Sequence, residues 1–405
     1  MHHLFEQHDH GNRLKTGMSS TTFDWHARTR IVFGAGEIDR IGELTNALGV
    51  RHALLVTDAG IVAAGHAAHA QHMLKKAGVR LTVFDRVREN PTTRCVEDCA
   101  AVARAAGIDG LIGLGGGSSM DTAKGCNFIL TNGGRMQDYW GVGKATKPML
   151  PFVAIPTTAG TGSECQSAAL IADEVTHQKM ACLDPKCAAR VAILDPALTL
   201  SQPPRVTACT GIDAIAHAVE TTVTKKRTSL SQLFSREAFR HCINAFPVVI
   251  ANPHDLEARG RMLLGASLAG MAIENSMLGA AHSAANPLTA HCDIVHGQAV
   301  GVMLPHVVRF NSADESTRND YAQLAAFAGL AGDGEDAASA VEKLIARLTE
   351  LLKQAGLETS LNGLGVKSEM IPKLAAEAAQ QWTATFNPRP VSAEDFIKLY
   401  QVAVR

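Results

Sequence analysis

The 405-residue sequence lacks the features of several classes of protein. No apolar run approaches the about 18 residues that a spanning helix needs, and the N-terminus has no apolar core of a signal peptide. Lys and Arg (38) balance Asp and Glu (39), so the net charge of −1 gives no basic footprint for nucleic acid or an anionic membrane. We therefore expect a cytoplasmic protein that binds neither nucleic acid nor a membrane.

The sequence also lacks any C-x-x-C pair, although it contains nine cysteines. An odd number of scattered cysteines does not suggest a disulfide framework or a zinc knuckle. A chain of this length, with 46% hydrophobic and 19% charged residues, can form two hydrophobic cores without disulfide bonds. We expect reduced thiols that act mostly as small buried apolar residues.

A glycine-rich stretch, Leu111 to Lys124, reads L-I-G-L-G-G-G-S-S-M-D-T-A-K. Apolar strand residues lead into three glycines, whose backbone can approach a bulky anion closely, and then into a helix whose first N–H groups favour a phosphate. The stretch lacks the Gly-Lys-Ser/Thr ending of a P-loop, which favours a dinucleotide pyrophosphate as ligand. The alternative is a glycine turn that packs tightly and binds nothing.

Short apolar strands alternate with helices through the first half of the chain. This alternation predicts a parallel sheet that is covered on both faces and binds ligands at the carboxyl ends of its strands. The expected strands are a short one from Arg30, then 53–57, 81–84, 111–114, 152–155 and 190–194, and the expected helices are 38–48, 61–77, 95–106 and 118–130.

After Pro203 the apolar residues recur at helical spacing and strand-like runs disappear. The helical segments are 206–223, 230–246, 256–277, 321–330, 337–352 and 371–379. We therefore predict an α/β domain over 23–204 and an all-helical domain over 205–405. Residues 1–22 are polar, unpatterned and rich in histidine, which predicts a disordered leader or a tag.

Asp213 and His217 lie four residues apart in the first of these helices, so both side chains face one side and can hold one cation. His282 and His296 offer two further imidazoles. One carboxylate and three imidazoles suit Fe²⁺ or Zn²⁺. Taken singly, each histidine is as well explained as a hydrogen-bonded core or surface residue, because the chain has 17 of them.

These segments together closely resemble the iron-containing (group III) alcohol dehydrogenase family. The shared motifs are G-G-G-S-S-M-D, P-T-T-A-G-T-G-S-E, T-G-I-D-A-I-A-H-A-V-E, A-H-S-A-A-N-P-L and H-G-Q-A-V-G-V-M-L-P-H. The resemblance runs from about Arg30 almost to the C-terminus. It implies a dehydroquinate synthase-like fold, with an N-terminal dinucleotide-binding α/β domain, an all-α C-terminal domain and catalysis in the cleft between them.

The resemblance assigns roles to individual residues. The metal ligands would be Asp213, His217, His282 and His296, holding Fe²⁺ with Zn²⁺ as the alternative. The residues that contact NAD, with NADP as the alternative, would be Asp58, Asn90, Gly115, Gly116, Gly117, Ser118, Asp121, Thr157, Thr158 and Lys179. Among these, Asp58 follows a strand, where an acidic side chain favours the ribose hydroxyls of NAD over the 2′-phosphate of NADP.

Two positions depart from the family pattern and make the proton path and the substrate uncertain. Asn286 stands where a second histidine usually follows the ligand His282, and His291 stands where an aromatic residue is common. An amide does not titrate near neutral pH, so the proton would leave through a ribose hydroxyl and water, or through His291 if the loop after Pro287 turns it inward. The alternative is that Asn286 only caps a helix before Pro287.

The resemblance implies metal-dependent hydride transfer between a nicotinamide cofactor and a small alcohol and its aldehyde or ketone, in a homo-oligomeric enzyme, a dimer or larger. Three alternatives remain at this point. Two are related superfamily activities, of the maleylacetate reductase and dehydroquinate synthase kinds, and the third is a catalytically silent nucleotide-binding subunit.

Overall fold

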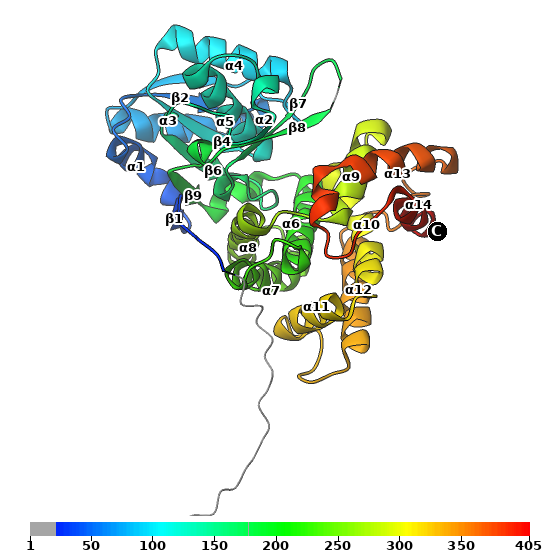
Figure 1. Ribbon diagram of the computed structural model, residues 1–405. Helices are drawn as coiled ribbons and strands as arrows, with labels where there is room; N and C mark the ends of the chain where they lie inside the picture. The colour runs from blue at the N-terminus through cyan, green and yellow to red at the C-terminus, as the bar shows by residue number, and fades with distance from the viewer. Residues whose placement is uncertain (1–21, 177) are drawn as a thin grey trace, which may run out of the picture.

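The computed structural model describes residues 22–176 and 178–405, so the expected leader lies outside the described residues except for Thr22. A six-stranded parallel sheet occupies the first half (Figure 1), in the order β1-β9-β6-β4-β2-β3. Because all six strands run the same way, their carboxyl ends share one edge, with β4 near the middle. The strands are β1 (Arg30–Phe33), β2 (His52–Val56), β3 (Arg80–Phe84), β4 (Gly110–Gly115), β6 (Phe152–Pro156) and β9 (Val191–Leu194).

Helices cover both faces of this sheet, as the apolar strands require. Alternate strand residues point to opposite faces: Ala53 and Leu55 belong to the core under α1 and α3, whereas Leu54 and Val56 belong to the core under α4 and α5. The bounds are α1 (Ile41–Ala47), α2 (Ala59–Ala63), α3 (His66–Lys76), α4 (Thr93–Ala106) and α5 (Gly117–Asn132). The predicted doubly covered α/β architecture is confirmed.

Two features of this half differ from the sequence-based expectation. The single helix expected over 61–77 is wrong, because Gly65 adopts a left-handed φ of 84° and separates α2 from α3. A small sheet was not foreseen: β7 (Ala168–Ala172) and β8 (Lys179–Leu183) pair antiparallel, with β5 (Gly141–Val142) beside β8. Its strands are rich in alanine and poor in β-branched residues, so they carry little strand signal.

The second half contains only helices among its described regular elements longer than a short 3-10 turn. They are α6 (Pro204–Val223), α7 (Ser229–Ala251), α8 (Leu256–Ser276), α9 (Ala280–Cys292), α10 (His296–Asn311), α11 (Glu315–Phe327), α12 (Ala337–Gln354), α13 (Ile371–Gln380) and α14 (Ala393–Ala403). The short 3-10 turns of the chain are η1 (Glu37–Arg40), η2 (Met136–Tyr139), η3 (Ser163–Cys165), η4 (Pro185–Cys187), η5 (Pro196–Ser201), η6 (Ser368–Met370) and η7 (Trp382–Phe386).

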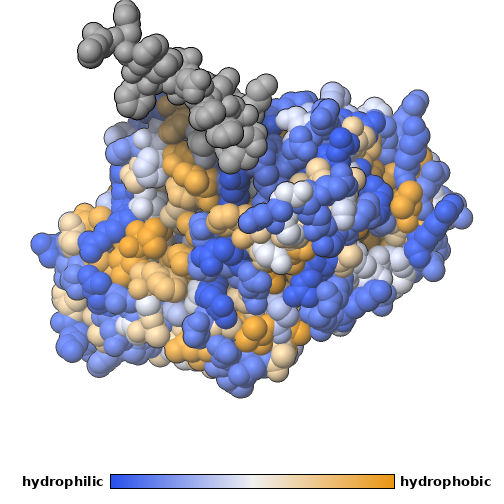
Figure 2. Space-filling model, turned by 90° about the horizontal axis from the view of Figure 1, so that it is seen from below, coloured by the Kyte–Doolittle hydropathy of each residue, from blue (hydrophilic) through white to orange (hydrophobic). Residues whose placement is uncertain are grey.

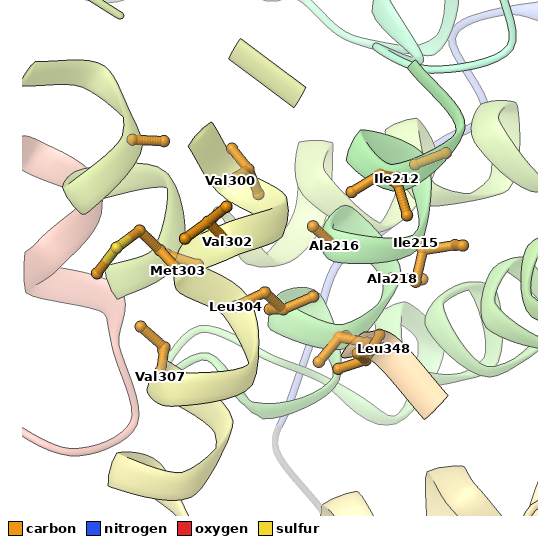
Figure 3. Packing of buried hydrophobic residues seen from close by; sticks show 14 of the residues in the cluster. Ile212, Ile215, Ala216, Ala218, Val300, Val302, Met303, Leu304, Val307 and Leu348 are labelled. Carbon is orange, nitrogen blue, oxygen red and sulfur yellow. The ribbon is translucent and has the colours of Figure 1, made fainter. Parts of the chain in front are cut away.

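The helix α6 lies at the centre of this half. Its side chains interlock with those of α10 and α12 in one apolar core (Figure 3), where Ile212 and Ile215 lie near Leu304 and Leu348. Since α6 also carries Asp213 and His217, the same packing that buries its apolar side fixes the position of the expected ligands. The site therefore rests on a rigid helix rather than on a loop.

Three helices of this half had no predicted counterpart. Two of them, α9 and α10, contain an internal proline, Pro287 and Pro305. Proline removes one backbone donor and is normally a sign of a helix end, so both segments look interrupted in the sequence. The third, α14, begins with a capping box formed by Ser392 and Asp395.

The surface and the thiols fit the compositional expectations where the structure describes them. None of the helices among the described residues is long and apolar enough to span a membrane. All nine cysteines are free, and seven of them are buried. The face shown in Figure 2 carries several hydrophobic patches between hydrophilic ones, and Phe23, Trp25 and Leu233 are among the large apolar side chains that stay exposed.

Candidate active site

The glycine loop lies where β4 ends and α5 begins. Gly115 has a φ of 149°, and a Cβ there would collide with Ser119 Oγ. A Cβ on Gly117 would lie 2.8 Å from Thr161 Cγ2. The N-cap residue of α5, Gly116, supplies no side-chain cap, so the first amides of this 16-residue helix remain available to an anion.

Other predicted cofactor residues lie beside this loop. A Cβ on Gly115 would be 3.4 Å from Asp58 Oδ2, so the Asp58 carboxylate stands next to the glycines. Its Oδ1 accepts a hydrogen bond from the Ile61 amide at 3.0 Å and caps α2. A Cβ on Gly116 would be 3.4 Å from Thr158 Cγ2, and the Thr157 amide donates to the Gly115 carbonyl at 2.9 Å.

Asn90 follows β3, the edge strand next to β2. It is exposed and adopts a left-handed φ of 52°. The structure therefore places Asn90 at the same edge of the sheet as Asp58, but no hydrogen bond from its side chain to a described residue fixes it there. Its predicted contact with the cofactor stays a prediction.

Asp121 has a different environment from the glycines before it. Its side chain is 9% exposed and accepts a hydrogen bond from Ser163 Oγ at 2.9 Å; burial raises its pKa. Lys124, which the sequence analysis did not single out, is 1% exposed and donates to Ser163 O, Ser163 Oγ and Ala168 O at 2.6, 2.8 and 2.9 Å. Asp121 and Lys124 thus hold the loop after β6 against α5.

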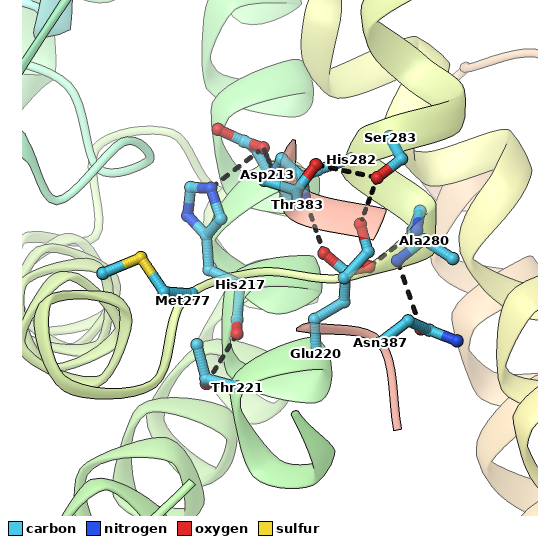
Figure 4. A network of polar contacts seen from close by, with 12 residues as sticks. Asp213, His217, Glu220, Thr221, Met277, Ala280, His282, Ser283, Thr383 and Asn387 are labelled. Atoms are coloured by element: carbon cyan, nitrogen blue, oxygen red, sulfur yellow. Dashed lines mark hydrogen bonds and ion pairs between the residues drawn. The ribbon is translucent and has the colours of Figure 1, made fainter. Parts of the chain in front are cut away.

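The four predicted metal ligands come together from α6, α9 and α10. The candidate ligand atoms of Asp213, His217 and His282 all lie within 4.8 Å of one another. Around Asp213 Oδ1, the Nε2 atoms of His282, His217 and His296 lie at 3.3, 3.5 and 3.9 Å. Figure 4 shows the side chains of Asp213, His217 and His282 pointing toward one another between the helices. One buried carboxylate with three imidazoles is a donor set that fits Fe²⁺ or Zn²⁺.

Glu220 orients one of these ligands and was missed in the sequence analysis. Its carboxylate accepts a hydrogen bond from His282 Nδ1 at 2.5 Å and from the Ala281 amide at 2.7 Å. Because Glu220 holds the Nδ1 proton, Nε2 is the atom of His282 that is directed to a bound cation. The signal was present in the sequence, because Asp213, His217 and Glu220 follow one another at steps of four and three along a single helix face.

The carboxylate and two of the three imidazoles are already in the protonation state that a cation needs. Burial would raise the pKa of Asp213, but His217, His282 and His296 hold that pKa well below its usual range. Burial lowers the pKa of His217 and lowers that of His296 to about 3, so both imidazoles are neutral near neutral pH. Burial would also lower the pKa of His282, but Glu220 and Asp213 raise it to about 9, so without a cation this imidazole holds a second proton, which a bound cation would displace from Nε2.

The loop after β6 links the glycine loop to the helix that carries Asp213 and His217. The loop after β6 rests on α6, since a Cβ on Gly160 would lie 2.6 Å from Thr210 Cβ, one turn before Asp213. Lys179 on β8 acts electrostatically on both Asp121 and His296: it opposes the rise in the pKa of Asp121 and adds to the fall in the pKa of His296. A dinucleotide bound at the glycines would therefore extend toward the cluster.

The two departures from the family pattern lie on α9. The expectation of a loop after Pro287 is wrong, because α9 continues to Cys292, and the alternative that Asn286 caps a helix before Pro287 is wrong for the same reason. Asn286 lies one turn after His282 and donates to Gln381 Oε1 at 3.0 Å. His291 is exposed, and its Nε2 lies 2.6 Å from Glu377 Oε2.

An anion-binding helix terminus that faces a buried cation-binding cluster is the arrangement of a metal- and nucleotide-dependent oxidoreductase. Comparison with known proteins gives the family. Residues 28–196 match the profile of iron-containing alcohol dehydrogenase, and residues 207–404 match the C-terminal part of the Fe-containing alcohol dehydrogenase family. The chain belongs to the iron-containing alcohol dehydrogenase family, as its sequence motifs predicted.

Individual relatives cover nearly the whole chain. The NAD-dependent methanol dehydrogenase of Bacillus methanolicus is 34% identical over 92% of this chain and 97% of its own length. The 1,3-propanediol dehydrogenase of Klebsiella pneumoniae is 34% identical over 95% of this chain and 100% of its own. Among solved structures, a 1,3-propanediol oxidoreductase superposes with a TM-score of 0.91 at 33% identity, covering 95% of this chain and 100% of that chain.

These comparisons confirm the fold class and the kind of enzyme. The chain is an oxidoreductase of a family that uses a metal ion and a nicotinamide cofactor, and the donor set of Asp213, His217 and His282 suits the ion. The individual roles of the cofactor-contacting residues, of Asn286 and of His291 stay predictions.

Proposed function

We propose that this enzyme interconverts small primary alcohols and their aldehydes with NAD, in the cleft between the glycine loop and the metal cluster. The observation that carries the proposal is the convergence of Asp213, His217, His282 and His296 on one point that faces the loops of the α/β half. A buried mixed carboxylate and imidazole set is a poor structural core on its own, because it brings polar groups out of water without apolar compensation. It is well suited to a divalent cation, iron in the first place and zinc as the alternative.

When bound, the cation would polarise the substrate oxygen as a Lewis acid and favour the alkoxide near neutral pH. The chain's own residues position and shield the reactants. The amides at the start of α5, with Gly115, Gly116, Gly117 and Ser118, would bind the pyrophosphate. Thr157, Thr158 and Lys179 would direct the nicotinamide toward the cluster, and Asp58 and Asn90 would hold the adenosine ribose.

The names of the relatives support a short primary alcohol as substrate. The similar proteins include the methanol and 1,3-propanediol dehydrogenases and, at 36% identity over 92% of this chain, a choline dehydrogenase of Bacillus subtilis. Methanol, 1,3-propanediol and choline differ in charge and length but share a primary hydroxyl group. That shared group is what we assign to the substrate of this chain.

On the substrate side, Asn286 is proposed to orient the alcohol or a water molecule, since it lies about 40° from His282 around α9. His291 lies about half a turn from His282 by the same count and pairs with Glu377, which supports a route through the ribose hydroxyl and water instead. His291 stays the alternative proton acceptor.

The test combines metal analysis with NAD reduction by a panel of primary and secondary alcohols. We expect about one iron or zinc per chain and activity with short primary alcohols only when that metal is present. His282→Ala and His296→Ala should lose the metal and the activity while still binding NAD, and His254→Ala, at an exposed histidine between α7 and α8, should behave as the parent protein. Full activity in metal-free His282→Ala protein would refute the proposal.

We also propose that the enzyme works in the cytoplasm as a homo-oligomer. Nine free cysteines, seven of them buried, support a reducing compartment. The exposed side chains of Phe23, Trp25 and Leu233, which are 47%, 45% and 59% accessible, support contact with a second copy of the chain. Light scattering of the purified protein tests whether it is a homo-oligomer, and a monomeric mass would contradict this proposal.

A further inference from the structure

A cavity of about 240 Å³ lies at the N-terminal end of α6, outside the metal cluster and the glycine loop. At about 30 Å³ for each water molecule it has room for roughly eight waters or one small organic molecule. The ends of α6, α7 and α12 and the first turns of α8 contribute its lining residues. Its apolar side is formed by Val249, Ile250, Pro253, Ala355 and Leu357, and its polar side by Gln202, Arg205, Thr207 and Arg259.

Arg259 brings a buried positive charge to this cavity without a matching carboxylate. The residue is 2% exposed. Its Nε donates to Pro253 O at 2.8 Å, and its Nη1 donates to Gln202 Oε1 at 3.1 Å and Thr207 Oγ1 at 3.3 Å. No described residue accepts from Nη2, and none forms an ion pair with this guanidinium. Burial alone lowers the pKa of Arg259, and a buried charge without a partner is costly.

Gln202 supplies a second unsatisfied donor at the same place. A guanidinium can only donate hydrogen bonds, so the contact with Arg259 fixes which end of the Gln202 amide is the oxygen. The Nε2 end therefore points elsewhere, and it is buried with no hydrogen-bond partner among the described residues. Leaving such a donor unpaired costs about 1–3 kcal/mol, which an acceptor in the cavity would recover.

The first turn of α6 adds further positive potential. Its N-cap residue, Pro203, provides no side-chain cap, and the amide of Arg205 has no partner among the described residues. The Arg205 side chain is exposed and also lines the cavity. Arg259, Gln202 and Arg205 thus all line one cavity, and its lining contains no carboxylate among the described residues.

We propose that this cavity is a binding site for a small organic monocarboxylate. The carboxylate would accept hydrogen bonds from Arg259 Nη2 and Gln202 Nε2, with Arg205 at the entrance, and a short aliphatic chain would lie against Ile250 and Leu357. The mostly apolar wall favours a carboxylate with an apolar body over inorganic phosphate, which would leave oxygens facing apolar side chains. The site is separate from the metal cluster and does not depend on the proposed reaction.

The experiment follows thermal unfolding of the full-length, metal-loaded protein with increasing sodium butyrate, at an ionic strength held constant with sodium chloride. We expect a saturable rise of the unfolding midpoint. Gln202→Glu places a carboxylate against the Arg259 guanidinium, so it should raise the midpoint without butyrate and weaken butyrate binding by about tenfold or more. Arg205→Gln should weaken binding several-fold, whereas Arg80→Gln, at another exposed arginine without a side-chain partner, should not.

The variant His282→Ala distinguishes butyrate binding in the cavity from butyrate binding at the metal cluster. If butyrate binds in the cavity, this variant should keep the butyrate-dependent rise of the unfolding midpoint. A rise that survives in both Gln202→Glu and Arg205→Gln but disappears in His282→Ala would overturn the proposal in favour of the cluster. The absence of a saturable rise in the parent protein would also overturn it. A rise with inorganic phosphate but none with butyrate would show that the assigned ligand class is wrong. If Gln202→Glu does not fold, Arg205→Gln and Arg80→Gln still decide the question.

Discussion

Glu220 touches no substrate position, yet it sets the state of a metal ligand. Because it accepts the His282 Nδ1 proton, it fixes the imidazole tautomer and turns Nε2 toward Asp213. We predict that Glu220→Gln lowers metal affinity about 10–100-fold, since the amide keeps the size but loses the charge that supports the imidazole. Metal titration of the apoprotein, followed by elemental analysis, measures this directly.

A suitable control for Glu220→Gln is Glu274→Gln. Glu274 also has low exposure and accepts hydrogen bonds from a backbone amide and a side chain, those of Ser167 at 2.8 and 2.5 Å. It contacts none of the metal ligands. Equal metal affinity in the two variants would show that the Glu220 carboxylate has no special effect on the cluster.

Asp58 combines a structural and a selective role, and two substitutions separate them. Asp58→Asn keeps the side-chain cap on α2 and removes the charge. Asp58→Gly removes both, and the loss of the cap lowers the stability of the helix by only a few tenths of a kcal/mol. Since a like charge beside a 2′-phosphate costs several kcal/mol, we expect both variants to raise the NADP to NAD ratio of kcat/KM by about tenfold or more. The hypothesis fails if the parent protein already uses both cofactors equally well.

Asn286 and His291 can be distinguished by the pH dependence of alcohol oxidation. We expect Asn286→His to change the profile between about pH 6 and 9, because it places a titrating imidazole on the face of His282. His291→Ala should have little effect, since His291 lies on another side of α9 and pairs with Glu377. If neither variant alters rate or profile, both residues lie outside the proton path.

The site residues that could be predicted from the sequence are those whose spacing places them on one face of a helix or at the end of a strand. Asp213 and His217 are of this kind, and so are the glycines after β4. Lys124 was not predictable, because its partners, Ser163 and Ala168, come from a loop about 40 positions away, separations of 39 and 44 residues. Its burial depends on that long-range contact and leaves no local pattern.

At the scale of elements, the glycine loop and the loop after β6 form one unit. Gly117→Ala would put a Cβ 2.8 Å from Thr161 Cγ2 and push the two loops apart. We predict a rise of about tenfold or more in the KM for NAD with unchanged metal content, because a displacement of about 1 Å can cost 10²-fold in rate or binding. Steady-state kinetics and metal analysis are the measurements.

A control for this substitution is Gly332→Ala, at a glycine whose added Cβ would meet its nearest atom only at 3.8 Å. Its kinetics should match those of the parent protein. An unchanged KM in Gly117→Ala would mean that the loops yield without disturbing the cofactor.

The elements themselves were predictable where periodicity was strong. The parallel strands and the long helices α6, α8 and α12 begin and end within two residues of the expected bounds. The small sheet of β5, β7 and β8 was not, because its alanine-rich strands carry little strand propensity, although β7 and β8 follow each other closely in the chain. This matters for function, because β8 carries Lys179 to the place between the two halves of the site.

At the scale of the whole molecule, the two halves meet through close backbone contact as well as through side chains. Gly162, in the loop after β6, has a φ of 63°, and a Cβ there would lie 2.7 Å from Gly270 Cα of α8. Next to this contact, Ser267 of α8 donates to Glu164 at 2.5 Å. The loop that faces the cofactor is therefore pressed directly onto the helical half, and its position depends on the absence of side chains at this point.

The variant Gly270→Ala tests whether this contact sets the geometry of the cleft. Its Cβ would lie 2.9 Å from Gly162 Cα, and since backbone cannot rotate away, the loop must shift. We predict a loss of about 1–3 kcal/mol in the free energy of unfolding, as for other overpacked cores, and a higher KM for NAD, with metal still bound. Urea unfolding and kinetics are measured on the same preparation.

Gly260→Ala provides the matched control because it lies on the same helix and its Cβ would meet Phe33 at an ordinary 3.5 Å. Alanine favours a helix over glycine by about 1 kcal/mol, so this variant should be as stable as the parent or more stable, with unchanged KM. Both variants gain the same helical propensity, and therefore any difference between them comes from the space at the two positions. If Gly270→Ala behaves like Gly260→Ala, the loop adapts to the extra methyl group, and the alignment of cofactor and metal does not depend on the contact between the halves.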